Sequence, residues 1–262
     1  MSARNGWNVI SRSYQEKTKI SLLDVHYGPI SPGESELKLL GNVKRKDVLE
    51  IGCGGGQNAI VLSKWGANAV GLDISKEQIK YAKKLAQKQK VSVPFRVGNM
   101  EDLSDFDDES FDIVLSSFAL QYADDIQKTF QEVFRVLRKS GVLVFAVTHP
   151  IIGRGRPLHF GKRKVWCISN YFDRRRRGWK WKVKEGVAEF NGRHITIEDY
   201  FDYLATAGFV VKRILEPKPY PLDKMSKGER KKIPYFEEGF SKDYEIWRKV
   251  PYTMIFKAEK PS

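Results

Sequence analysis

The sequence has few cysteines and no long apolar run, and each shortage excludes a class of protein. Cys53 and Cys167 are the two cysteines among 262 residues, too few for a disulfide framework and without the spacing of a metal site. This usage favours a reducing cytoplasm. No apolar stretch approaches the roughly 20 residues that cross a bilayer, and residues 1–19 lack the apolar core of a signal peptide. We therefore expect neither export nor membrane insertion.

The rest of the composition is that of a globular protein with an uneven positive charge. Hydrophobic residues make up 41%, aromatic residues 12% and charged residues 30% of the chain, which excludes a disordered or collagen-like protein. The length suits one large α/β domain, or one domain with a lid. Of the net charge of +14, residues 151–184 carry +11, from twelve basic residues and one acidic residue.

Strands and helices alternate over the first 150 residues. The apolar pattern predicts strands at residues 47–52, 68–75, 93–97, 111–117 and 142–147, and helices at residues 58–65, 76–89 and 124–139. Ser75 is the expected N-cap of the second helix, with Gln78 at its third position, and Gly141 is expected to end the third helix. This alternation predicts a parallel sheet with helices on both faces.

The pattern changes after Pro150. Residues 151–193 are basic, interleaved with aromatic residues, and we find no sustained period of two or 3.6 in them, so we interpret them as an inserted cap. Regular structure is expected again as a helix over residues 196–207, with Thr196 and Asp199 as its capping box, followed by strands at 209–217 and 252–260. Residues 218–247 are predicted to form a second polar excursion.

A glycine turn follows the first predicted strand, and an acidic residue follows the second. Glycines at the end of a strand let a ligand approach the backbone, and open α/β sheets bind ligands at the carboxyl ends of their strands. Asp73 lies 21 residues after Gly52, where a carboxylate can accept both hydroxyls of a ribose. Gln57 stands where a dinucleotide fingerprint needs Gly or Ala, which argues against NAD. The pattern therefore predicts a site for a different nucleoside.

At this point the chain resembles the class I S-adenosylmethionine-dependent methyltransferases. VLEIGCGGG is similar to the family's E/D-x-G-x-G-x-G loop, GLDIS to its ribose-binding strand end and VGNMEDL to its adenine loop. FDIVLSSFALQY and VFRVLRKSGVLVF resemble its fourth strand, the following helix and its fifth strand. The match covers about residues 47–148 and looks most like the branch with quinone-biosynthesis and other small-molecule methyltransferases.

The resemblance implies a fold, a cofactor and a set of binding residues. The fold is an α/β, Rossmann-like, doubly wound seven-stranded mixed sheet with an antiparallel last strand, and the cap is inserted after the fifth strand. Residues 1–45 would form a helical lid and residues 46–262 the methyltransferase domain. The residues that would hold S-adenosylmethionine are Glu50, Gly52, Gly54, Gly56, Asp73, Ile74, Asn99, Met100 and Ser117.

Within this set the resemblance assigns separate roles. The three glycines would line the methionine and ribose, Asp73 would accept the ribose hydroxyls, and Ile74 would pack on the adenine. Asn99 and Met100 would meet the adenine edge. Ser117 would lie near the methionine end, or its hydroxyl would cap the local backbone instead.

A catalytic residue is not required, because methyl transfer from a sulfonium is accelerated by alignment and desolvation alone. If the acceptor is a hydroxyl or an acidic carbon, a general base helps, and the candidates are His149, His194, and His26 or Tyr27. His149 follows a strand end on the ligand side, but a histidine before a proline also suits a structural turn. Trp7 and Tyr14 would share one face of an N-terminal helix, either covering the cofactor or packing on the sheet.

The basic aromatic cap leaves two classes of acceptor open. Cations interleaved with aromatic rings suit an RNA, and they equally suit an acidic or aromatic small molecule. Ser116-Ser117-Phe118-Ala119 differs from the D/N-P-P-Y/F motif of enzymes that methylate exocyclic base nitrogens, and there is no Pro-Cys or Thr-Cys pair for pyrimidine C5. We therefore favour a small-molecule acceptor over RNA. Two other hypotheses for the function are a pure binding module and a nicotinamide oxidoreductase. The sequence carries no signal for a metal or for an oligomeric state.

Overall fold

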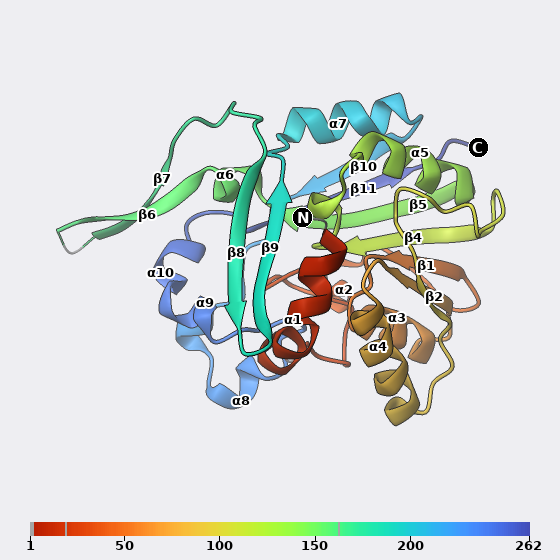
Figure 1. Ribbon diagram of the computed structural model, residues 1–262, viewed down its shortest axis with the longest axis horizontal. Coiled ribbons are helices and arrows are strands. Elements are labelled where there is room, and N and C mark those ends of the chain that lie inside the picture. Colours follow the sequence, from red (N-terminus) through yellow and green to blue (C-terminus); the bar gives the residue numbers. More distant parts are fainter. Residues whose placement is uncertain (1–2, 19, 162) are drawn as a thin grey trace.

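The computed structural model describes residues 3–18, 20–161 and 163–262, and a seven-stranded sheet forms its centre (Figure 1). The strand order is β10-β11-β5-β4-β1-β2-β3. These strands are β1 (Asp47–Ile51), β2 (Asn68–Asp73), β3 (Phe95–Val97), β4 (Phe111–Ser117), β5 (Leu137–Thr148), β10 (Val210–Leu215) and β11 (Thr253–Glu259). Strand β11 is antiparallel to both neighbours and the remaining pairs of the sheet are parallel. The expected mixed sheet with an antiparallel last strand is confirmed.

Helices cover both faces of the sheet, because alternate side chains of its strands point to opposite faces. They are α3 (Gln57–Lys64), α4 (Lys76–Gln89), α5 (Ile126–Val136) and α7 (Ile197–Thr206), and a 3-10 turn, η1 (Leu120–Tyr122), follows β4. On β1, Val48 packs with α3 and α4, whereas Leu49 and Ile51 pack with α5 and α7. The sheet is therefore doubly wound, as predicted.

The predicted capping residues begin their helices. The hydroxyl oxygen of Ser75 accepts a hydrogen bond from the backbone N–H of Gln78 at 3.2 Å. Thr196 and Asp199 form a reciprocal capping box at the start of α7. Each contact satisfies a backbone N–H that has no partner inside the helix, which is why these residue types occur at these positions.

The junction between α5 and β5 differs from the prediction. The helix expected over residues 124–139 ends at Val136, β5 begins at Leu137, and Gly141 lies inside the strand instead of ending the helix. Leu137 pairs with Phe111 of β4. This sheet pairing holds the segment extended, and it depends on a residue more than twenty positions away.

The cap contains regular structure that the sequence analysis missed. It holds α6 (Pro150–Gly153) and two antiparallel hairpins, β6 (Gly155–Phe160) with β7 (Arg163–Ile168), and β8 (Arg177–Val183) with β9 (Gly186–Gly192) (Figure 1). The prediction of a segment without a period of two is wrong for β8, where Trp179, Trp181 and Val183 alternate with Gly178, Lys180 and Lys182. The hairpins lie outside the main sheet, so most of their side chains are exposed, including large apolar ones such as Val165 and Ile168.

The N-terminal helix and the C-terminal segment complete the molecule on the side of the cap. Helix α1 (Ala3–Thr18) lies against β9, and Ile10, Ala188 and Phe190 are buried between them. The remaining short helices are α2 (Glu34–Leu37), η2 (Leu222–Lys224), α8 (Lys227–Arg230), α9 (Gly239–Lys242) and α10 (Tyr244–Trp247). None of the helices in the described ranges combines the length and the apolar character that a membrane crossing requires.

Candidate functional site

A cavity of about 110 Å³ lies at the carboxyl ends of β1, β2 and β4. Strand β1 pairs with β2 on one side and β4 on the other, so the chain changes direction across this point, which is where open α/β sheets bind ligands. Eight of the nine predicted binding residues line the cavity: Glu50, Gly52, Gly54, Asp73, Ile74, Asn99, Met100 and Ser117. Gly56 does not line it.

Asp73 is held in place by the backbone around it. Its side chain is buried, and its two carboxylate oxygens accept hydrogen bonds from the N–H groups of Gly54 and Ser75, each at 2.8 Å. Burial raises the pKa of Asp73 to about 6, and these two hydrogen bonds oppose the rise. The carboxylate therefore joins the glycine loop to the end of β2 while still facing the cavity.

Glu50 is a second buried carboxyl group of the cavity. One of its oxygens accepts a hydrogen bond from the N–H of Ala59 in α3 at 3.0 Å. Burial raises the pKa of Glu50 to about 8, and the negative charge of Asp73 adds to this rise. Neither acid has a cationic partner within the described part of the chain, and two such buried acids are costly, so this end of the cavity is suited to a positively charged ligand.

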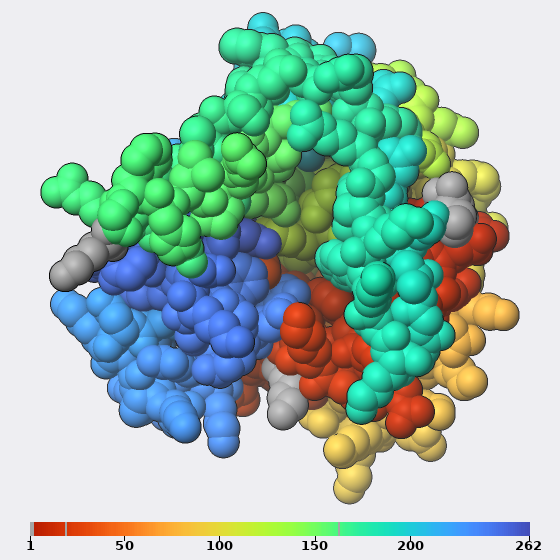
Figure 2. All heavy atoms as spheres, turned by 60° about the vertical axis from the view of Figure 1, so that its left-hand side comes forward, coloured from red at the N-terminus to blue at the C-terminus, as the bar shows by residue number. Residues whose placement is uncertain are grey.

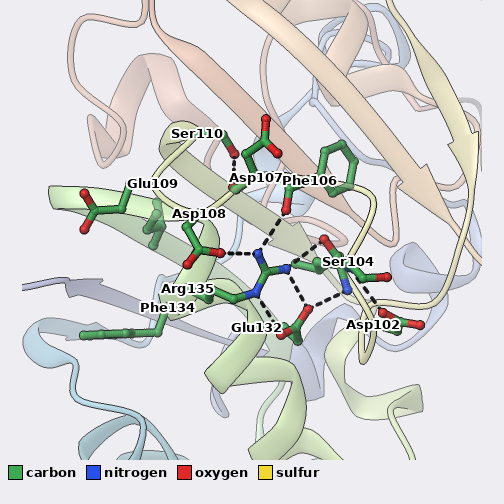
Figure 3. A network of polar contacts seen from close by, with 12 residues as sticks. Asp102, Ser104, Phe106, Asp107, Asp108, Glu109, Ser110, Glu132, Phe134 and Arg135 are labelled. Carbon is green, nitrogen blue, oxygen red and sulfur yellow. Dashed lines mark hydrogen bonds and ion pairs between the residues drawn. The ribbon is translucent and has the colours of Figure 1, made fainter.

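Arg135 of α5 holds residues 103–108, the segment that follows Asn99 and Met100 in the same loop (Figure 3). The guanidinium forms hydrogen bonds with Glu132 at 2.9 and 3.1 Å and with Asp108 at 2.7 Å, and it also donates to two loop carbonyls. Asn99 uses its own side-chain oxygen to accept from the N–H of Glu101 at 3.2 Å. Its amide therefore shapes the loop, and its NH₂ group has no hydrogen-bond partner among the described residues.

Ser117 and His26 lie together at the other end of the cavity. The Ser117 hydroxyl donates to the carbonyl of His26 at 2.8 Å and lies 3.3 Å from the Asn58 amide, so it serves the local backbone. His26 is 93% buried and lines the cavity, and its Nδ1 has no hydrogen-bond partner among the residues that the structure describes. Its ring meets that of Tyr235 edge-on, with centroids 5.3 Å apart.

The two histidines singled out by sequence position do not line this cavity. His149 caps α6: its Nδ1 accepts from the N–H of Ile151 at 3.2 Å and its Nε2 lies 2.7 Å from Glu216. His194 packs edge-on against Tyr171 in the cap, and burial lowers its pKa to about 4. His149 thus fills the structural turn position that its neighbouring proline suggested.

Helix α1 lies over the glycine loop. The Gln15 amide donates to Gln78 at 2.9 Å and accepts from Gln57 at 2.6 Å, and it lies directly over Gly55. Trp7 and Tyr14, which share a helix face as predicted, both line the cavity, and their ring centroids are 5.2 Å apart. Trp7 packs on the cap rather than on the sheet, through Trp181 and Phe190. Sequence reasoning did not single out Gln15 or Tyr235, because only the fold brings them to the loop.

Comparisons with known proteins agree with this geometry. Residues 49–145 match the family described as "Methyltransferase domain". The chain carries a methyltransferase domain. It is 28% identical over 149 residues to Uncharacterized methyltransferase YbaJ of Bacillus subtilis, covering 56% of this chain and 58% of that protein. It is 35% identical over 109 residues to Ubiquinone biosynthesis O-methyltransferase of Pelagibacter ubique, covering 42% and 43%. The chain thus spans about half the length of these curated relatives.

A solved structure shares the fold of this methyltransferase domain. An S-adenosylmethionine dependent methyltransferase from Mesorhizobium loti superposes with a TM-score of 0.65 at 23% identity, covering 85% of this chain and 94% of that one. The ubiquinone-biosynthesis relative agrees with the branch that the motifs resemble. S-adenosylmethionine is the cofactor that this family and fold imply.

The cavity of the methyltransferase domain fits that cofactor chemically. A Cβ added to Gly54 would meet no atom closer than 4.0 Å, so this glycine leaves the cavity wall open. Asp73 offers acceptor oxygens for ribose hydroxyls, and the acidic end around Glu50 suits the positive charges of the amino-acid part. We therefore assign Glu50, Gly52, Gly54, Asp73, Ile74 and Met100 to cofactor binding, as a proposal.

Gly54 and Gly56 test this assignment as a matched pair, because both have a positive φ, of 52° and 76°. Alanine at either position carries the same left-handed strain, about 1–2 kcal/mol. A Cβ at Gly56 would lie 2.5 Å from the Phe95 ring, whereas one at Gly54 enters the cavity. We expect Gly54→Ala to weaken S-adenosylmethionine binding about tenfold with a modest loss of stability, and Gly56→Ala to lose mainly stability. Calorimetry and thermal unfolding of both variants measure this; equal loss of affinity would contradict it.

Proposed function

We propose that the protein transfers a methyl group from S-adenosylmethionine to a small molecule by in-line displacement. The observation that carries this proposal is the cavity at the ends of β1 and β2, where the Asp73 carboxylate and the bare backbone of Gly54 face the same space. The bound cofactor supplies a methyl carbon activated by its sulfonium. The residues of this chain bind it, orient it and exclude water, and this alignment accounts for much of the acceleration.

In this proposal an N-terminal lid and the basic cap together exclude water from the site. Residues 1–45 act as the lid, since Gln15 is bonded across the glycine loop and the Asn8 side-chain oxygen accepts from the Ser75 hydroxyl at 2.8 Å. Residues 151–193 act as the cap over the acceptor. The lid and the domain of residues 46–262, which contains the cap, act as one functional unit.

The pairing of the arginine run supports a small molecule over RNA as the acceptor. Arg174 binds Asp199, Arg176 binds Asp124, and Arg175 and Arg177 both bind Asp173. These guanidinium groups connect the cap to α7 and to the cavity rim. A nucleic-acid surface uses cations that are free to contact phosphates. Because these four arginines are paired with carboxylates, their arrangement supports a structural role in the cap rather than RNA binding.

The first test of the proposal measures cofactor binding, and the second determines the class of the acceptor. Purified protein is expected to bind S-adenosylmethionine with one site in calorimetry and to show no saturable binding of NADH by fluorescence. Mass spectrometry of the protein as purified is expected to detect an adenosyl nucleoside. Absence of cofactor binding would overturn the proposal, and saturable methylation of a defined RNA would replace the small-molecule acceptor.

The free cysteines, with Cys167 exposed, support a cytoplasmic setting for this activity.

A further inference from the structure

A second and larger cavity lies beside the cofactor cavity. Its volume is about 700 Å³, and its walls come from α1, from β8 and from the segments before β11. In Figure 2 the two hairpins, α1 and the C-terminal segment surround a hollow on this face of the molecule. Five residues line both cavities: Trp7, Tyr14, Phe118, Tyr122 and Tyr235. The two cavities are therefore neighbours across a shared aromatic wall.

Aromatic rings dominate the wall of this second cavity. Trp7 meets Trp181 edge-on with centroids 5.9 Å apart, and Phe240 meets Tyr252 in the same way at 5.0 Å. Rings set at right angles present both faces and edges to the enclosed space, which are the surfaces on which a planar aromatic ring packs best. The cavity is also within the size range of small-molecule sites.

The charges of this wall distinguish between anionic and cationic ligands. Lys17 is paired with Glu237 and Lys180 with Glu189, each at 2.5 Å. Lys182 also lines the cavity, and it has no acidic partner within 4.0 Å among the described residues. The unpaired ammonium favours an anion, and it opposes the cationic ligands that aromatic cages otherwise attract.

His26 supplies the polar group at the junction of the two cavities. It lines the cofactor cavity, while its edge-on partner Tyr235 lines both cavities and shares a hydrogen bond of 2.9 Å with Tyr14. Burial lowers the pKa of His26 to about 3, so the ring is neutral and one of its nitrogens is an acceptor. Because His26 lines the cofactor cavity, a ligand hydroxyl that reaches past Tyr235 can donate a hydrogen bond to the neutral ring.

We infer that the second cavity binds a planar aromatic acceptor that carries an acid group, with the acid near Lys182 and a hydroxyl hydrogen-bonded to His26. This inference rests on the proposed function, because it makes the second cavity the acceptor half of a methyl-transfer site. It adds the chemical class of the acceptor and the two residues that select it. Neither residue lies on the methyltransferase motifs of the sequence.

The test titrates small probes into the protein saturated with S-adenosylhomocysteine, and reads tryptophan fluorescence and calorimetry. The probe is 4-hydroxyphenylacetate, compared with tyramine, which has an ammonium instead of the carboxylate, with phenylacetate, which lacks the hydroxyl, and with cyclohexylacetate. We expect 4-hydroxyphenylacetate to bind most tightly and tyramine at least about tenfold more weakly. Tyramine binding as tightly as 4-hydroxyphenylacetate would overturn the inference.

Three variants assign the selectivity to residues. Lys182→Gln is expected to weaken 4-hydroxyphenylacetate about two- to fivefold, whereas Lys184→Gln, the same charge change on an exposed turn residue outside the cavity, leaves it unchanged. His26→Asn is expected to remove the preference for 4-hydroxyphenylacetate over phenylacetate, about three- to tenfold in the wild type. A merely structural histidine would weaken both probes equally, and that result would overturn its role.

Binding of S-adenosylhomocysteine is measured first, and this measurement distinguishes a failure of the proposed function from a failure of the acceptor inference. If S-adenosylhomocysteine does not bind, the proposed function fails and the acceptor site fails with it. If it binds and 4-hydroxyphenylacetate does not, the acceptor inference alone is overturned. Equal effects of Lys182→Gln and Lys184→Gln would also overturn it, because the selectivity would then come from net charge.

Discussion

Replacing Asp73 with alanine is expected to weaken S-adenosylmethionine binding by about tenfold to a hundredfold. Hydrogen bonds to a charged group are worth about 1.5–3 kcal/mol, which corresponds to this range. The carboxylate also accepts from the N–H groups of Gly54 and Ser75, so its loss frees the glycine loop that forms the cavity wall. Isothermal titration calorimetry of the variant against the wild type measures the change.

Two further variants make the Asp73 result specific. Asp73→Asn keeps one acceptor oxygen and the shape of the side chain, so an affinity between those of the wild type and Asp73→Ala is expected. Asp202→Ala removes an exposed carboxylate of α7 that lies outside both cavities, and its affinity is expected to equal that of the wild type. An unchanged affinity in Asp73→Ala would remove the main support for a nucleoside cofactor at this site.

The central sheet could be predicted because each of its strands carries its own local signal. The apolar run that ends at Ile51 and its glycine turn mark a strand end, and Ser75 marks the start of the next helix without reference to the rest of the chain. Since carboxyl ends of parallel strands meet at one edge, the glycine turn after β1 and Asp73 at the end of β2 could be placed together from the sequence, and the family resemblance added Glu50. The cavity lining agrees with that placement.

The parts that could not be predicted depend on contacts between distant segments. Gly56 follows the glycine pattern, but its bare α-carbon faces the ring of Phe95 rather than the cavity, and this contact is made by a strand forty residues away. His26 was one of several histidine candidates. Its position at the junction depends on Tyr235, from a segment that showed only as polar.

The cap shows a different reason for failure. Its hairpins lie outside the main sheet, so apolar and basic side chains are both exposed there, and on β8 the alternation rests on two tryptophans among lysines. Trp181 and Phe190 pack on Trp7 of α1, at the other end of the chain. The charge run was visible in the sequence, whereas its acidic partners Asp124 and Asp199 could be found only in the fold.

The affinity for S-adenosylmethionine is expected to fall as the pH is lowered through the range set by Glu50 and Asp73. In the free protein burial raises the pKa of Glu50 to about 8 and that of Asp73 to about 6, so both carboxyl groups gain protons on going from pH 8.5 to pH 5.5. A cationic ligand favours the ionised forms, so its binding must release these protons. Each proton released costs up to about tenfold in affinity per pH unit below the free-state pKa.

Calorimetry at pH 8.5 and 6.5 is expected to give a loss of affinity of at least about tenfold, with proton release visible as a dependence of the heat on the buffer. Glu50→Gln is the diagnostic variant, because it cannot ionise and should bind weakly at pH 8.5 without the upper part of the pH dependence. Because burial raises the pKa of Glu50 in the folded protein, this group lowers the stability of the ligand-free protein at any pH above its pKa in the unfolded chain. The Gln variant should therefore melt higher than the wild type at pH 8.5 without ligand, by about 5 °C or more. A wild-type affinity that is flat with pH would mean that Glu50 does not face the cationic part of the cofactor.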